Sequence, residues 1–125
     1  MIPALPYNDT GDTSAALDDY DESAVGGCSS ASTSPDLVYS YTPTVDEIVN
    51  IDLCNGSSYD TKIYIYDEDL NLVACNDDYY DAASGCGEFV SFIEDMFVYE
   101  GVTYIIVVDG YGGEAGAYDL KMTLN

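Results

Sequence analysis

The 125-residue chain has no histidine, tryptophan or arginine, and Lys62 and Lys121 are its only cationic side chains. Without histidine, the Ser-His and Cys-His pairs of nucleophilic catalysis cannot be assembled. The usual zinc ligand sets are excluded as well, because the four cysteines also show no CxxC spacing. Paired carboxylates can hydrolyse glycosides, but a pair is uninformative in a chain with 24 Asp and Glu. We therefore expect a protein that is not an enzyme.

The scarcity of cations leaves a formal net charge of −22 at pH 7. This charge repels nucleic acids and anionic lipids, because nucleic-acid affinity depends on Lys and Arg that displace counterions from phosphates. No run approaches the roughly 20 apolar residues that a membrane-spanning helix needs. The sequence therefore predicts no nucleic-acid partner and no membrane insertion. Self-repulsion must be relieved by spreading the carboxylates over solvated surfaces or by neutralising clusters with divalent metal.

Four cysteines, Cys28, Cys54, Cys75 and Cys86, predict two disulfide bonds, for which three pairings are possible. We favour Cys75 with Cys86, which closes a short polar loop, and Cys28 with Cys54, which ties the N-terminal segment to the domain. Each bond would contribute on the order of 3 kcal/mol in the chain-entropy model. The alternative is four buried reduced thiols. Disulfides form in oxidising compartments, so we expect a secreted protein, extracellular or at the cell surface.

Hydrophobic periodicity predicts one all-β domain. Residues 1–35 are rich in Asp, Ser, Thr, Gly and Ala, and they indicate an acidic N-terminal arm or cap packed on the domain. No stretch of residues 36–125 keeps a helical period, and apolar residues alternate in short runs instead. The predicted strands include 37–42, 49–53, 61–67, 72–75, 88–93, 102–108 and 117–124. About seven or eight short strands predict an antiparallel β-sandwich, jelly-roll-like, over residues 36–125.

A succession of short segments resembles a known family. The chain contains SPDLVYSYTP at 34–43, SYDT at 58–61, YIYD at 64–67, ACNDD at 74–78, GVTYIIVVDGY at 101–111 and GAYDL at 116–120. This succession resembles the bacterial pre-peptidase C-terminal domain family and covers nearly the whole chain. That family is a secreted β-sandwich often appended to exported enzymes, and the related collagen-binding domains of collagenases bind collagen and calcium. The resemblance implies an accessory domain without catalytic activity.

Clustered aspartates point to calcium as the cofactor. Calcium takes about six to eight oxygen ligands and tolerates irregular geometry, so several carboxylates on short loops suit it. The acidic run at 18–22 also resembles, in position and composition, the metal-binding N-terminal segment of the collagen-binding modules. The alternative for each run is a solvated acidic surface. The candidate metal ligands are Asp18, Asp19, Asp21 and Glu22 in the arm, Asn76, Asp77 and Asp78 in a polar loop, and Asp36 and Asp60 at strand starts.

Tyrosine is abundant, with 13 residues in the chain. Tyr79, Tyr80 and Tyr111 fall in predicted loops, where an apolar ring with a polar hydroxyl suits binding of sugar or protein. The alternative is that they cover the edges of the core. For Tyr64 and Tyr66, on a predicted strand, packing on the sheet is the favoured interpretation.

Two sites match the short acceptor pattern for N-glycosylation. They are Asn8-Asp9-Thr10 and Asn55-Gly56-Ser57. The pattern is common, and its use depends on the organism.

Two functions follow. The first is a calcium-binding module for adhesion or accessory binding to extracellular protein or polysaccharide. The second is a self-assembling extracellular subunit, a filament or surface fibre, whose N-terminal arm adds a strand to the open sheet edge of another copy. Head-to-tail contacts that do not close produce filaments, and calcium between subunits would offset their repulsion.

Overall fold

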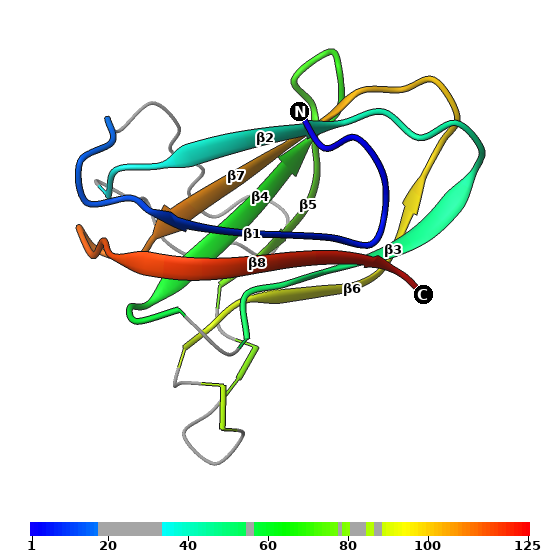
Figure 1. Ribbon diagram of the computed structural model, residues 1–125. Helices are drawn as coiled ribbons and strands as arrows, with labels where there is room; N and C mark the ends of the chain where they lie inside the picture. Colours follow the sequence, from blue (N-terminus) through cyan, green and yellow to red (C-terminus); the bar gives the residue numbers. More distant parts are fainter. Residues whose placement is uncertain (18–33, 55–56, 78, 81–84, 87–88) are drawn as a thin grey trace.

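The computed structural model describes residues 1–17, 34–54, 57–77, 79–80, 85–86 and 89–125. These residues form eight strands in two antiparallel sheets of four, and none of them is helical (Figure 1). The predicted all-β antiparallel sandwich is therefore confirmed. Within the same ranges there is no helix with the length and apolarity to cross a membrane.

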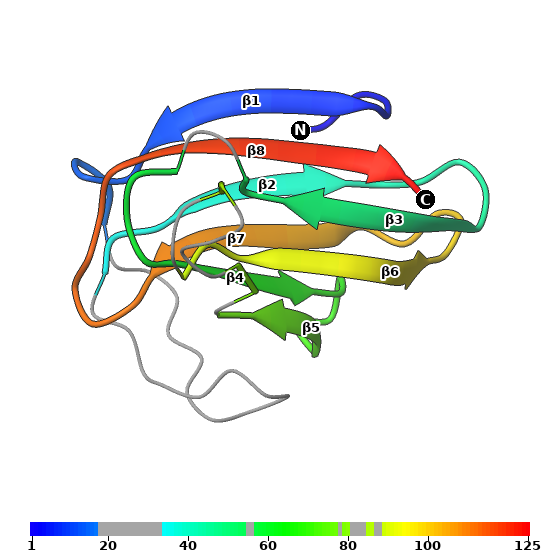
Figure 2. The ribbon, with the colours of Figure 1, turned by 90° about the horizontal axis from the view of Figure 1, so that it is seen from below.

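The two sheets form the layers of the sandwich, and their strands run between two ends of the molecule (Figure 2). We call them sheet A and sheet B. Sheet A has the order β1 (Tyr7–Asp12), β8 (Ala117–Leu124), β3 (Glu47–Asp52) and β6 (Phe92–Val98). Sheet B has the order β2 (Leu37–Tyr41), β7 (Tyr104–Gly110), β4 (Thr61–Tyr66) and β5 (Leu72–Asn76).

The main hydrophobic core lies between the sheets and follows the alternation of the sequence. In β8 the buried side chains of Tyr118, Leu120 and Met122 alternate with more exposed residues, as the pattern of apolar residues predicts. The central strands supply branched aliphatic side chains, which suit the pleated surface. Fully buried members of this core include Val49, Ile51, Ile63, Ile65, Ile106, Val108 and Leu120.

Sheet B also buries side chains on the face that points away from the main core. Tyr64, Tyr66 and Val107 form a second buried cluster, and they alternate along β4 and β7 with residues of the main core. All six residues of β4 are consequently buried. The expectation that Tyr64 and Tyr66 pack on the sheet is confirmed.

A strand lies within the stretch that was expected to be an arm. Residues Tyr7–Asp12 form β1 and pair with β8 from Tyr7 opposite Met122 to Asp12 opposite Ala117. Its sequence, YNDTGD, has one large apolar residue. An edge strand with one solvated face can form with few apolar residues. Composition alone does not reveal such a strand. The rest of the expected arm, at 18–33, lies outside the described residues.

Two strands are displaced from their predicted ranges. The strand expected at 88–93 is observed as β6, Phe92–Val98, and the strand expected at 102–108 is observed as β7, Tyr104–Gly110. Phe89 and Asp95 have positive φ angles of 66° and 57°, and the β3–β6 register shifts between Val49 and Ile51. The extended backbone therefore begins after Phe89, and a bulge at Asp95 breaks the alternation that a sequence pattern detects.

The flank formed by β1 and β2 is closed by polar contacts between the sheets. The Tyr39 hydroxyl on β2 donates a hydrogen bond to Asp9 Oδ2 on β1 at 2.7 Å, and it lies 2.7 Å from the Tyr118 hydroxyl on β8. Burial, together with these hydrogen bonds, raises the pKa of Tyr39, so its hydroxyl stays protonated. The Ile2 N–H donates to the Ser40 carbonyl at 2.7 Å, which fastens the N-terminal segment along the edge of β2.

Gly11 leaves the space that Tyr118 occupies at this flank. A Cβ at residue 11 would lie 2.5 Å from Tyr118 Oη and 2.6 Å from Cζ. We expect Gly11→Ala to lower the free energy of unfolding by about 1–3 kcal/mol, because the ring must shift. Urea denaturation measures the change. The control Thr10→Ala, at an exposed position on the same strand, should stay within about 0.5 kcal/mol. Equal effects of the two variants would contradict the tight contact.

Candidate functional site

The topology brings four chain connections to one end of the sandwich. These connections follow β1, β3, β5 and β7, and we call their described residues, within 13–36, 53–60, 77–91 and 111–116, the loop end (Figure 2). Cross-strand pairs place the strand termini together: Thr61 lies opposite Gly110, Asp52 lies opposite Phe92, and Asp12 lies opposite Ala117. Residues far apart in the sequence therefore share this end.

Most of the described candidate residues lie at or beside the loop end. Asp36 precedes β2, Asp60 precedes β4, Asn76 ends β5 and Asp77 follows it. The candidates Asp18, Asp19, Asp21, Glu22 and Asp78 lie outside the described residues. In the part of the chain that is described, no group of three or more His, Cys, Asp or Glu side chains is arranged to hold a metal ion.

Four charged residues form a row across this end of sheet B. Lys62 on β4 pairs directly with Asp109 on β7. Leu37 on β2 lies opposite Val108, so Asp36, which precedes Leu37, comes beside Asp109. Asn76 on β5 lies opposite Ile63, so Asp77, which follows Asn76, comes beside Lys62. The order across the strands is thus Asp36, Asp109, Lys62 and Asp77, and we call these four residues the acidic row.

The acidic row is buried. Lys62 and Asp109 are 0% exposed, Asp36 is 3% exposed and Asp77 is 9% exposed. The ammonium of Lys62 lies 5.5 Å from the centre of the Tyr64 ring, a distance typical of a cation–π contact. Three carboxylates and one ammonium give the row a formal charge of −2, and the sequence has no other cation except Lys121 on β8 of sheet A.

Sequence reasoning missed two members of the row, Lys62 and Asp109. Each lies next to an apolar run, TKIYIY for Lys62 and YIIVVDG for Asp109. A charged residue in a strand that is otherwise buried on both faces is the signal that could have identified them, because such residues are rarely buried unless they are paired.

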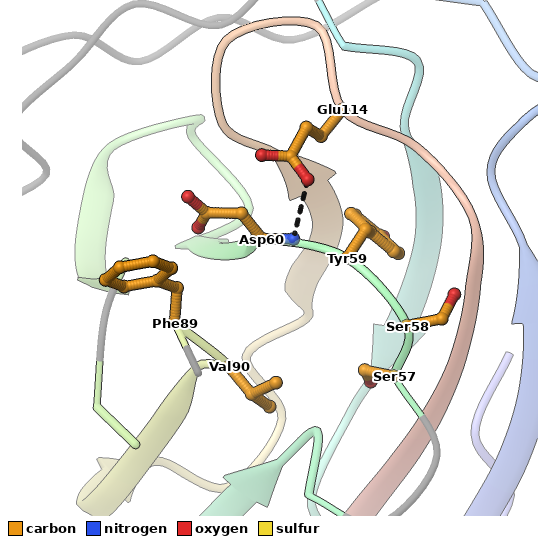
Figure 3. A pocket seen from close by; sticks show the side chains of 7 residues that line it. All are labelled: Ser57, Ser58, Tyr59, Asp60, Phe89, Val90 and Glu114. Carbon is orange, nitrogen blue, oxygen red and sulfur yellow. Dashed lines mark hydrogen bonds between the residues drawn. The ribbon is translucent and has the colours of Figure 1, made fainter. Parts of the chain in front are cut away.

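A pocket of about 390 Å³ opens between three of the loops. The Asp60 N–H donates to Glu114 Oε1 at 3.3 Å, which links the loop before β4 to the loop before β8 (Figure 3). The Phe89 ring lies across the pocket from Tyr59 (Figure 3). We call this cavity the loop-end pocket, and it is lined by Ser57, Ser58, Tyr59, Asp60, Phe89, Val90 and Glu114.

Phe89 occupies a costly backbone conformation at the rim of this pocket. Its φ is 66°, and a bulky side chain rarely adopts this left-handed region. The Phe89 N–H donates to the Tyr80 carbonyl at 3.0 Å, and the Val90 carbonyl accepts from Tyr79 and Tyr80 at 3.2 and 3.1 Å. These hydrogen bonds hold the chain in this conformation, and Phe89 is 44% exposed. Strained residues of this kind cluster at binding sites.

Two of the predicted binding tyrosines belong to one aromatic cluster. Tyr79 lies 5.0 Å from Tyr80 and 4.8 Å from Phe92 between ring centroids, while the rings of Tyr80 and Phe92 are stacked at 6.0 Å. The Tyr80 hydroxyl donates to Asp52 Oδ1 at 3.0 Å, and burial together with this bond raises the pKa of Tyr80. Tyr79 itself is 51% exposed.

The third predicted tyrosine lies in a different loop. Tyr111 donates its N–H to the Asp60 carbonyl at 2.9 Å and accepts from the Glu114 N–H at 3.0 Å. Its side chain is 43% exposed. Tyr111 therefore neighbours two residues of the loop-end pocket through its backbone, although its side chain does not line it.

The disulfide pairing differs from the one favoured by the sequence. Cys54, after β3, is bonded to Cys86, with 4.6 Å between Cα atoms and a sequence separation of 32. Cys86 lies in the connection that crosses from sheet B to sheet A, which carries it to the end of β3. Cys75, which is also disulfide-bonded, packs against the second buried cluster. The favoured Cys75–Cys86 and Cys28–Cys54 pairing is therefore wrong, and Cys28 itself lies outside the described residues.

Comparisons with known proteins identify no relative: no family model, no curated protein and no solved structure matches the chain. The resemblance to the pre-peptidase C-terminal domain therefore stays a prediction.

Disulfide mapping checks the pairing at the loop end. Digestion without reduction should yield a cross-linked peptide pair containing Cys54 and Cys86, which separates after reduction. The double variant Cys54→Ser/Cys86→Ser should lose about 2–4 kcal/mol of stability, because the bond restricts the unfolded chain. Recovery of Cys75 linked to Cys86 by mass spectrometry would contradict this pairing.

Proposed function

We propose that the chain is a secreted, non-catalytic, calcium-binding module that adheres to extracellular protein or polysaccharide through its loop end. The observation that carries the proposal is the gathering of buried carboxylates, a ligand-sized pocket and exposed aromatic rings at one end of a rigid sandwich. A disulfide bond at the same end supports secretion, because such bonds persist in oxidising compartments.

The buried carboxylates of the loop end favour calcium for an electrostatic reason. The acidic row gathers three carboxylates and one lysine in a buried part of the fold, and like charges that lie close together disfavour one another. Calcium binds carboxylate and carbonyl oxygens from irregular loops. The predicted ligands Asp36, Asp60 and Asp77 come from three different loops at this end. The remaining predicted ligands are Asn76, Asp18, Asp19, Asp21, Glu22 and Asp78.

The chemistry of the surface around the loop-end pocket supports adhesion. Its volume of about 390 Å³ lies in the range of small-molecule or side-chain sites. Asp60, Glu114 and two serines offer hydrogen-bonding groups, while Phe89 offers an apolar ring. Tyr79 and Tyr111 extend the exposed aromatic surface. This combination suits one sugar residue or one side chain of a partner protein.

Self-assembly into a filament is the weaker proposal. β1, the strand within the expected arm, is already paired with β8 of its own chain. Donating it to another copy would first break that pairing. Two copies would also meet with a formal charge of −22 each.

Calcium binding is tested by thermal unfolding in millimolar calcium and in excess chelator. A ligand that binds only the native state stabilises that state by about 2.7 kcal/mol when the ligand concentration is one hundred times the dissociation constant. The melting temperature should therefore rise by several degrees in calcium. The variant Asp36→Asn should lose most of this rise, whereas Glu68→Gln, at an exposed position in the turn between β4 and β5, should keep it. No response of the wild type to calcium would exclude the metal. Growth in particle size with calcium would favour the filament.

Adhesion is tested by retention on collagen, chitin and cellulose. The variant Phe89→Gly suits the positive φ of that residue and removes the ring from the loop-end pocket, so stability should be preserved while retention falls about tenfold. Leu70→Gly is the matched control, because Leu70 also has a positive φ, of 61°, and is 60% exposed, in the turn between β4 and β5. Failure of the wild type on all three supports, or equal retention of both variants, would contradict adhesion through this pocket.

A further inference from the structure

The two flanks of the sandwich differ. The flank of β1 and β2 is closed by the contacts of Tyr39 with Asp9 and Tyr118. On the flank of β5 and β6, the Phe92 N–H donates to Asn76 Oδ1 at 3.1 Å beside the loop end. Farther from the loop end, a cavity of about 450 Å³ opens between these two edge strands. We call it the edge groove.

The edge groove is apolar and exposed. Its walls include three exposed side chains, Val73, Phe97 and Tyr99, which are 47%, 61% and 56% exposed. Buried side chains of the core, Ile93 and Met96, also line it. Exposed apolar side chains gathered at one groove are typical of a docking surface.

Neither edge strand is suited to accept another strand in a regular ladder. The β4–β5 register shifts between Ile65 and Tyr66, which leaves Val73 without a cross-strand partner in β4. In β6, Asp95 has a φ of 57°, and its N–H donates to Asn50 Oδ1 at 2.9 Å. Bulges at sheet edges prevent strand addition. A partner would therefore insert side chains into the groove.

The negative charge around the groove favours a cationic partner. Glu94 and Asp95 line it together with the apolar residues, whereas Lys62 is buried in the acidic row and Lys121 lies on β8. A second copy of the chain, with the same excess of carboxylates, would be repelled. A cationic partner would be attracted by both the local and the overall field.

We infer that the edge groove docks a basic segment of a partner protein. An aliphatic or aromatic side chain of that segment fills the space between Val73 and Phe97, and flanking Lys or Arg side chains pair with Glu94 and Asp95. The groove lies on a different part of the surface from the loop-end pocket. Docking there does not require calcium.

The inference is tested by titrating the full chain, in excess chelator, with the synthetic peptide KKLFKK, capped at both ends and fluorescently labelled. Fluorescence anisotropy should show saturable binding. Phe97→Ser should weaken binding about tenfold or more, since an apolar anchor loses its contact. Val38→Ser is the control, at a position 46% exposed on β2 at the other flank. Glu94→Gln should also weaken binding, whereas Glu68→Gln should not.

Two further peptides separate the contribution of charge to binding from that of the apolar anchors. KKSGKK keeps the charge without the apolar anchors, and EELFEE keeps the anchors with the opposite charge; both should bind at least about tenfold more weakly than KKLFKK. Equal binding of KKSGKK, or unchanged binding to Phe97→Ser, would overturn the inference. Dimerisation of the wild type in high salt that Phe97→Ser abolishes would identify a second copy as the occupant and would also overturn it. Because chelator is present throughout, failure of this test is independent of the calcium proposal.

Discussion

The cross-strand pair of Lys62 and Asp109 sets the electrostatic conditions at the loop end. Both residues are fully buried, and an isolated buried charge is strongly destabilising. Their pairing joins β4 to β7 at the point where the loops before β2 and after β5 bring in Asp36 and Asp77. With three carboxylates and one lysine, the acidic row has a formal charge of −2 at this end of sheet B. The proposal for calcium follows from that charge.

The remaining acidic residues have a different effect. Of those that the structure describes, more than half are exposed, and such carboxylates repel anionic partners and attract cationic ones. The hydrophobic core between the sheets supplies the stability that offsets their mutual repulsion, and Tyr39 closes one flank with hydrogen bonds to Asp9 and Tyr118. The loop end and the edge groove are thus two surfaces of distinct chemistry on one scaffold. The first combines buried carboxylates with a pocket lined by both polar and aromatic side chains, and the second combines exposed apolar side chains with Glu94 and Asp95.

The regular strands were predictable because burial alternates with period two. The range 117–124 was predicted for β8 and is observed, since nothing interrupts Tyr118, Leu120 and Met122. β6 was displaced because the backbone at Phe89 and Asp95 leaves the extended region, which no pattern of apolar residues indicates. β1 was missed because pairing with β8 stabilises a strand whose own sequence is polar. The Cys54–Cys86 bond depends on the path of a loop between the two sheets, so spacing in sequence could not select it.

Calcium titration followed by amide chemical shifts tests the central claim most directly. The account predicts saturable shifts confined to the loop end, at the amides around Asp36, Asp60, Asp77 and Asp109. The turns at the opposite end, around Asp46 and Glu68, should stay unchanged. Shifts that are small, unsaturable and spread over all acidic surfaces would show that the carboxylates attract calcium only as a diffuse counterion, and the account of the loop end as a metal-binding site would be wrong.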